Sequence, residues 1–366
     1  MLGVLRSFTL AESPSTEKAP ADRCAELIAA EWRERDVRVE LVPQKVRGNH
    51  IRIECKPATA TKSSGQLLVL GHYDTVYATG TLDKMPFHAS GPKVFGPGVF
   101  DMKAGIVQAL FALDALLATH APVRKQIVFL WTSDEEIGSE SSRKLLESEA
   151  ARSDAVFVLE PSLGPKGLLK TARKGVGEAE ITVQGKASHA GLAPEKGINA
   201  VHEMALQIAR ILKWNDLRRG VTVNADVVHG GSRVNVIAET ARAALDLRAL
   251  RISDMHAIEK KLNALKPLLR GAKLEVTGGF TRAPLERKIS VELFGRAKTL
   301  AAQMGISLGE GTAGGASDGN FTAALGIPTL DGLGAVGDGA HSRHEHILAN
   351  TMPERAAVLA VLLASS

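Results

Sequence analysis

Histidine and acidic residues recur directly after short apolar runs of the sequence. The runs are "QLLVL" (66–70), "QIVFLW" (126–131) and "AVFVL" (155–159). The residues that follow these runs, or stand in "GPGVFDMKAG" and "GDGAHSRHEHI", are His72, Asp74, Asp101, Glu135, Glu136, Glu160 and His341. Imidazole nitrogens and carboxylate oxygens suit borderline divalent cations, Zn²⁺ first, with Co²⁺ or Mn²⁺ as alternatives. The residue types therefore predict a metal site.

The apolar runs have the length of buried strands, and "KAGIVQALFALDALLA" (103–118) between them has the length of a helix. This alternation predicts an α/β fold with a mostly parallel sheet, in which ligands bind beyond the carboxyl ends of the strands. Taken singly, His72 could be a hydrogen-bonded loop residue, Asp101 a helix N-cap and Glu136 a solvent-facing acid. Their recurrence at one expected sheet edge favours the metal site.

The pattern of elements changes between residues 174 and 284. Alternating and helical runs there follow the order β-α-β-β-α-β, which is the split βαβ arrangement of a small α+β domain of ferredoxin-like type. The last helix of this series is expected to begin with Ser253 as its N-cap. We therefore expect residues 1–173 and 285–366 to form one catalytic domain and residues 174–284 to be inserted into it.

Composition excludes several classes of protein. Hydrophobic residues make up 45% and charged residues 23%, as in an ordinary globular chain, and no run reads as a transmembrane span or signal peptide. This favours a cytoplasmic protein without membrane contact. Basic residues are in excess within 174–284, but they are scattered and aromatics reach only 4%, so nucleic-acid binding is not expected. Cys24 and Cys55 lack metal-ligand spacing and are expected to be buried thiols.

Seven motifs together resemble one enzyme family. They are "GHYDTV", "GPGVFDMKAG", "TSDEEIGS", "VLEPS", "GKASHAG", "GGASDGN" and "GAHSRHE", in consistent order from residue 71 to 345, and "LAESPS" near the start also fits. The chain resembles the dinuclear zinc carboxypeptidases and acyl-amino-acid deacylases that include glutamate carboxypeptidase of the carboxypeptidase G type and acetylornithine deacetylase. The resemblance implies two Zn²⁺ per chain and a homodimer formed through residues 174–284.

The resemblance also assigns ligands. It implies that Asp101 bridges the two metals, that Glu136 and His341 complete one, and that His72 and Glu160 complete the other. His344 and His346 are rival ligands to His341. In relatives the peptide bond after the bridging Asp is often cis, which would here be Asp101–Met102.

Further roles come from the same resemblance. Glu135 would be the general base and then acid, Asp74 would orient His72, and His189 would stabilise the oxyanion in the partner subunit's site. Asn235 and Arg248 match positions near substrate, although structural capping is an alternative, and Ala238 replaces a proline common in relatives. Gly315 and Ser317 would lie in a turn near the substrate carboxylate.

The implied activity is hydrolysis of an amide bond beside a free carboxylate, releasing C-terminal glutamate or another amino acid from an N-acyl amino acid or short peptide. A small-molecule deacylase acting on acetylornithine or succinyl-diaminopimelate is the alternative, because it would use the same catalytic residues. A catalytically silent binding homologue would require loss of Glu135 or of a ligand, and all are present. "GEGTAG" (309–314) fits a dinucleotide-binding pattern, but no clear strand precedes it.

Overall fold

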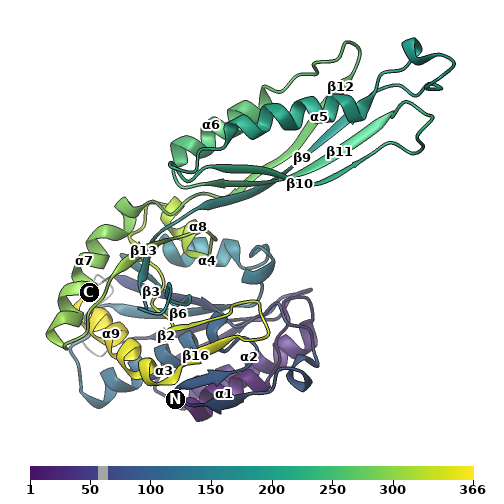
Figure 1. Ribbon diagram of the computed structural model, residues 1–366. Coiled ribbons are helices and arrows are strands. Elements are labelled where there is room, and N and C mark those ends of the chain that lie inside the picture. Colours follow the sequence, from purple (N-terminus) through teal and green to yellow (C-terminus); the bar gives the residue numbers. More distant parts are fainter. Residues whose placement is uncertain (57–64) are drawn as a thin grey trace. The chain divides into compact units, whose positions relative to one another are not determined.

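A six-stranded sheet forms the centre of the first of two compact units (Figure 1). The computed structural model describes residues 1–56 and 65–366, and this unit comprises Met1–Ala172, Arg287–Ala313 and Ser317–Ser366. The strand order is β1-β2-β6-β3-β7-β14. Strands β6, β3, β7 and β14 are mutually parallel, and β2 and β1 extend the sheet in antiparallel fashion. The predicted mainly parallel α/β sheet is confirmed. The strands are β1 (Arg38–Val42), β2 (His50–Cys55), β3 (Gln66–His72), β6 (Gln126–Thr132), β7 (Ala155–Val158) and β14 (Thr329–Leu330).

Both faces of this sheet are covered by helices, which is why its central strands read as continuous apolar runs. In β3, Leu67 and Val69 pack into one hydrophobic cluster and Leu68 and Leu70 into another, because successive side chains of a strand point to opposite faces. The first cluster includes residues of α1 (Leu2–Leu10), α2 (Lys18–Arg33), α3 (Ala104–Ala118), α7 (Arg287–Gln303) and α9 (Met352–Ser365). The second includes residues of α4 (Arg143–Ala150) and α8 (Gly319–Ala324).

Two smaller sheets complete the first unit. One has the order β15-β16-β5-β4, and in the other β13 pairs with β8. Their bounds are β4 (His88–Ser90), β5 (Lys93–Phe95), β8 (Leu169–Arg173), β13 (Glu310–Ala313), β15 (Gly337–Asp338) and β16 (His346–Leu348). The motif "GEGTAG" lies along β13 instead of on a strand-to-helix turn, so it lacks the context of a dinucleotide site.

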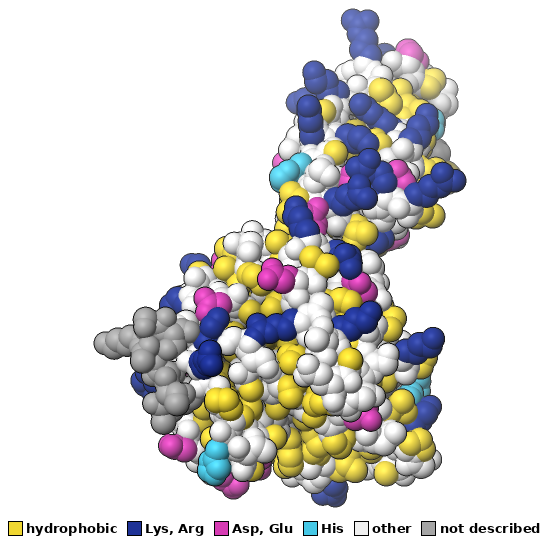
Figure 2. Space-filling model, turned by 90° about the vertical axis from the view of Figure 1, so that its left-hand side faces the viewer, with side chains coloured by type: hydrophobic (Ala, Val, Ile, Leu, Met, Phe, Trp, Pro, Cys, Tyr) yellow, Lys and Arg dark blue, Asp and Glu magenta, His cyan; other side chains and the backbone are white. Residues whose placement is uncertain are grey.

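The second unit comprises Arg173–Glu286 and Gly314–Ala316. Its elements are β9 (Gly175–Gln184), α5 (Ala200–Ile211), β10 (Thr222–Gly230), β11 (Thr240–Ala249), α6 (Ile252–Asn263) and β12 (Lys273–Arg282). The antiparallel sheet has the order β10-β11-β9-β12, and the two helices pack on one face (Figure 1). The predicted ferredoxin-like element order is thus confirmed. Lys and Arg side chains gather on the surface of this unit (Figure 2).

Two features differ from the sequence-based expectation. Helix α6 begins at Ile252 with Arg251 as its N-cap, so the prediction of Ser253 as the N-cap is wrong. The Glu286 carboxylate accepts a hydrogen bond from the Ile252 N–H at 3.3 Å, which satisfies a free amide of the first turn from outside the helix. Helix α1 was not expected, and its Leu5 and Phe8 are buried in the core. No helix in the described ranges is long and apolar enough to cross a membrane.

Candidate metal centre

The ends of the central strands deliver the site residues to one edge of the sheet. His72 is the last residue of β3, Glu160 follows β7, and Glu135 and Glu136 form the short helical turn η3 (Glu135–Ile137) just after β6. Asp101 lies in the turn η2 (Val99–Lys103) that leads into α3. His341 lies between β15 and β16 with a left-handed backbone (φ 60°).

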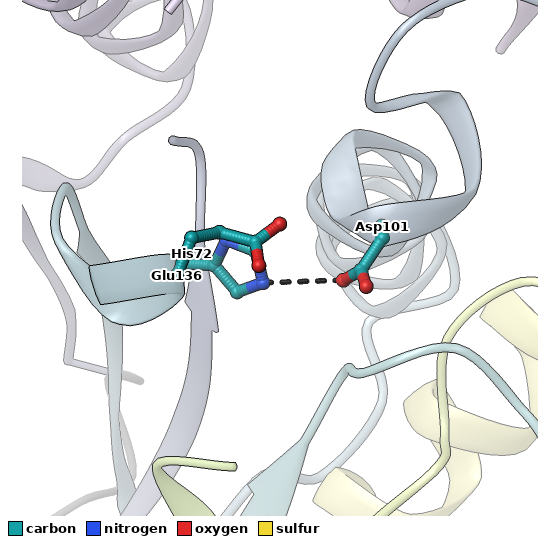
Figure 3. A group of neighbouring side chains, drawn as sticks. All are labelled: His72, Asp101 and Glu136. Carbon is teal, nitrogen blue, oxygen red and sulfur yellow. Dashed lines mark ion pairs between the residues drawn. The ribbon is translucent and has the colours of Figure 1, made fainter. Parts of the chain in front are cut away.

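Asp101 lies between two groups of donor atoms. Its Oδ1 is 3.3 Å from His72 Nε2, and its Oδ2 is 3.6 Å from His341 Nε2. His72 Nε2 is also 3.4 Å from Glu160 Oε1, and His341 Nε2 is 2.9 Å from Glu136 Oε2. Figure 3 shows the side chains of His72 and Asp101 pointing toward each other. Each carboxylate oxygen of Asp101 therefore faces a different histidine.

Two overlapping sets of side chains are close enough to hold a metal ion. His72, Asp101 and Glu136 form one, and His72, Glu135 and Glu160 form the other; within each set the ligand atoms lie within 4.8 Å of one another. His72 Nε2 and Asp101 Oδ1 are buried, and neither makes a hydrogen bond within residues 1–56 and 65–366. Buried polar atoms without a hydrogen bond are costly, so these two atoms fit a bound cation.

Without a bound metal, the neighbouring carboxylates favour the protonated forms of the two histidines. Hydrogen bonds to Asp101 and Glu136 raise the pKa of His341 to about 10. Burial favours neutral His72, but the Asp101, Asp74 and Glu160 carboxylates outweigh burial and raise the pKa of that imidazole. Burial raises the pKa of Glu136. A metal ion would therefore compete with protons for both imidazoles.

Asp74 connects His72 to the turn that carries the two glutamates. His72 Nδ1 lies 3.1 Å from the Asp74 backbone oxygen and 3.4 Å from Asp74 Oδ1, and both partners are acceptors. In the neutral ring, which is the form that binds metal, Nδ1 therefore carries the proton and Nε2 keeps its lone pair. The Asp74 carboxylate also accepts hydrogen bonds from the N–H groups of Glu135 and Glu136, each at 3.3 Å. One buried carboxylate thus orients groups on two strand ends.

Glu345 is a site residue that the sequence did not reveal. Its fully buried carboxylate accepts hydrogen bonds from the N–H groups of Gly98 (3.0 Å), Phe100 (2.8 Å) and Asp101 (3.0 Å). The Asp101–Met102 peptide bond in the same turn is cis, as the family resemblance implied. Glu345 is the last residue of the motif "GAHSRHE", but the sequence alone assigns it no role.

The rival histidines face other partners. His346 Nδ1 lies 2.8 Å from the His344 backbone oxygen, and His344 Nδ1 lies 3.0 Å from Ser342 Oγ. Ser317, expected near substrate, is fully buried and donates its hydroxyl proton to Asp331 Oδ2 at 2.6 Å. The neighbouring Gly315 offers its backbone oxygen to the Arg173 guanidinium at 3.1 Å.

The second unit brings together the loops of His189 and Asn235. The Ala190 N–H donates to the Asn235 backbone oxygen at 2.9 Å, and both predicted residues are exposed. His189 Nδ1 accepts from the N–H groups of Gly191 and Leu192, each at 3.1 Å, so the proton of the neutral ring is on Nε2. Arg248 forms a bidentate ion pair with Asp246 on the same strand.

Comparison with known proteins identifies the family of this site. Residues 68–365 match peptidase family M20/M25/M40. The chain belongs to this family. It is therefore a hydrolase of the metallopeptidase type. Among curated M20 relatives, carboxypeptidase G2 of Pseudomonas sp. (strain RS-16) is 31% identical over 305 residues, which are 81% of this chain and 73% of that protein.

Other curated proteins and solved structures are also similar to this chain. Succinyl-diaminopimelate desuccinylase of Paraburkholderia xenovorans is 28% identical and aligns with 78% of this chain and 79% of its own length. The aminopeptidase PepT structure from Bacillus cereus has a TM-score of 0.84 at 20% identity, covering 99% of this chain and 97% of PepT. The Bacillus subtilis YXEP protein, a dinuclear metal-binding M20 peptidase, has a TM-score of 0.75 at 15% identity, covering 100% and 96%. These two structures show the same fold.

Proposed function

We propose that this M20 hydrolase binds two divalent cations, zinc first, and cleaves an amide bond beside a free carboxylate. Its preferred product would be a C-terminal glutamate or another free amino acid, since carboxypeptidase G2 is 31% identical over most of the chain. The observation that carries the dinuclear site is that the two oxygens of Asp101 face different histidines. A carboxylate in that position can serve two cations at once.

The donor atoms support a division of the ligands. Asp101 would be shared, His72 and Glu160 would hold one ion, and Glu136 and His341 would hold the other, as their short contacts suggest. When bound, two such ions lower the pKa of a water molecule and polarise the carbonyl group to be attacked.

The chain's own residues then handle the proton. Glu135 is mostly buried and lies close to His72 and Glu160, which supports the proposal that its carboxylate takes the proton of the attacking water and returns it to the leaving amine. Asp74 keeps the proton of His72 on Nδ1 and so leaves Nε2 free to bind metal. Glu345 holds the backbone of Asp101.

Residues of the second unit are proposed to contact substrate. With two N–H groups directed at Nδ1, His189 presents Nε2–H as a donor, which suits stabilisation of an oxyanion. Asn235, Arg248 and Gly315, together with Ser317 of the first unit, are proposed to line the substrate site. Arg248 would have to exchange Asp246 for a substrate carboxylate, a partner of the same charge and geometry.

We further propose a homodimer formed through residues 174–284, in which His189 serves the partner's site. Strand β10 is an edge of its sheet, and Val227 and Val228 on it are each 49% exposed. An exposed apolar edge strand is suited to pairing with another chain. Light scattering after size exclusion should show a dimer, and Val228→Lys should shift it to the monomer.

A second candidate function is removal of a succinyl or acetyl group from a diamino acid. The 28% identity to succinyl-diaminopimelate desuccinylase favours it, and both activities would use one set of catalytic residues. The two activities differ in the acyl group and amine that the pocket accepts.

The deciding experiment is amine release from a substrate panel. Zinc-loaded protein would be assayed with folyl-glutamate, other N-acyl amino acids, dipeptides, acetylornithine and succinyl-diaminopimelate. We expect the highest kcat/KM with an acylated glutamate and loss of activity after chelation. A preference for succinyl-diaminopimelate would establish the second function instead, and activity that survives complete metal removal would contradict both.

A further inference from the structure

The N-terminal segment of residues 8–15 touches both parts of the chain that carry central metal ligands. The Thr75 N–H donates to the Ser13 backbone oxygen at 2.9 Å, and the Ser15 N–H donates to the Thr75 oxygen at 3.1 Å. Residues 13–15 therefore run beside the segment that follows His72. Residues 8–15 contain the whole motif "LAESPS" (10–15), to which the mechanism assigns no task.

At its other end the same segment is tied to the turn of Asp101. Lys103, only 1% exposed, donates from Nζ to the backbone oxygens of Phe8 and Ala11, each at 2.9 Å. Lys103 stands two residues after Asp101. Residues 8–15 thus link the His72–Asp74 segment to the Asp101 turn. These two parts of the chain face each other across the site.

One side chain of this segment contacts a group that orients the ligands. Ser15 Oγ donates to Asp74 Oδ2 at 2.7 Å, and Ser15 and Asp74 are 3% and 0% exposed. The other neighbours of this carboxylate are the N–H groups of Glu135 and Glu136 and the ring of His72. Ser15 therefore makes the shortest of these contacts to the Asp74 carboxylate, which lies between the His72 ring and the turn of Glu135 and Glu136.

We propose that Ser15 is a positioning residue of the metal centre. Its hydroxyl fixes the rotation of the Asp74 carboxylate, and through it the His72 ring and the Glu135–Glu136 turn. This inference rests on the proposed dinuclear site. Groups that orient metal ligands commonly change metal affinity or activity by about 10- to 100-fold when removed.

Ser13 provides a matched control two residues away. It is also buried, and its Oγ donates at 2.6 Å to the Tyr73 backbone oxygen, in the segment that Ser15 contacts, but not to Asp74. Ser13→Ala and Ser15→Ala each remove one buried hydroxyl group, although the Ser15 hydroxyl also lies 3.2 Å from the Thr75 backbone oxygen. Since each hydroxyl has a single proton to donate, the midpoints of urea unfolding should fall by similar amounts. A purely structural role for Ser15 predicts equal effects of the two variants on the metal centre as well.

The test measures zinc per chain and its rate of loss to a chromogenic chelator, with kcat and KM. We expect Ser15→Ala to lose metal about tenfold faster or more and to lower kcat with KM nearly unchanged, while Ser13→Ala keeps wild-type values. In an Asp74→Asn background, Ser15→Ala should add no further effect. Ser15→Cys, which keeps a weak donor of similar shape, should lie between wild type and Ser15→Ala.

The opposite outcomes are distinct. Wild-type metal loss and kcat in Ser15→Ala, equal changes in Ser13→Ala, or a full additional effect in the Asp74→Asn background would each overturn the role of Ser15. A wild-type protein that takes up no metal would overturn the proposed function and this inference together.

Discussion

The Glu345 carboxylate accepts a hydrogen bond from the backbone N–H of Asp101 at 3.0 Å. Glu345 lies four residues after His341, a predicted metal ligand. The same carboxylate also accepts hydrogen bonds from the N–H groups of Gly98 and Phe100, so one acid holds three backbone donors of this turn. Glu345 thereby joins the segment of His341 to the turn of Asp101, the predicted shared ligand.

Replacing Glu345 by Gln should weaken the centre. A carboxamide has only one oxygen and brings N–H donors to a place where three donors already point, leaving buried groups unpaired. We expect a loss of about 1–3 kcal/mol in the free energy of unfolding, measured by urea titration, together with lower zinc content. Glu354→Gln, at an exposed position of α9, is the control and should change neither. Wild-type stability and zinc content in Glu345→Gln would refute this role.

Glu135→Gln should abolish turnover while the protein keeps about two zinc ions per chain. The carboxamide cannot take a proton, and general acid–base catalysis contributes about 10²- to 10⁴-fold to rate. The measurements are kcat on the best panel substrate and zinc by mass spectrometry. The exposed neighbour Glu140 offers a matched Glu→Gln control that should stay fully active. A Glu135→Gln enzyme of near-normal kcat would move the proton-transfer role to another residue.

His341→Ala should remove one of two zinc ions. His341 Nε2 lies next to Glu136 and Asp101, whereas His344 faces Ser342, so His344→Ala is the control. We expect zinc content to fall from about two to about one ion per chain in His341→Ala and to remain unchanged in His344→Ala. Should the two variants behave in the reverse manner, His344 would be the ligand.

His50 should make the protein less stable in mild acid. Burial lowers the pKa of this histidine below 6.5, although Asp134 acts in the opposite direction. The unfolded chain then binds a proton more readily than the folded one below pH 6.5, so stability that is present above this pH is lost as pH falls toward the folded pKa.

The test of His50 compares urea unfolding of metal-free protein at pH 7.5 and 5.5. Wild type should lose more stability between these values than His50→Gln, which cannot be protonated. The exposed His202→Gln should behave like wild type. Equal pH dependence of wild type and His50→Gln would show that His50 does not contribute.

The strand-end residues could be predicted from sequence because a simple rule places them. His72 and Glu160 follow buried strands that are parallel, and such strands end at one edge of the sheet. The element order of residues 174–284 was equally readable, because its period-2 and helical patterns are regular.

Ser15 and Glu345 could not be found in this way. Each is a single polar residue in an irregular segment, and its partner lies 59 or 244 residues away in sequence. No local pattern specifies such a contact, since it exists only after the strands and turns have packed. The N-cap of α6 was predicted wrongly for the same reason, because the N–H of Ile252 donates to Glu286, which lies far outside the helix in sequence.

The first unit is built from segments that precede and follow the second unit in the chain, and this sets the order in which the predicted ligands are synthesised. His72, Asp101, Glu136 and Glu160 all precede the second unit in the chain, whereas His341 follows it. The first four predicted ligands are therefore synthesised long before His341, and the whole of the second unit is made in the interval. A chain cut short before residue 341 would therefore carry four of the five predicted ligands and lack the last.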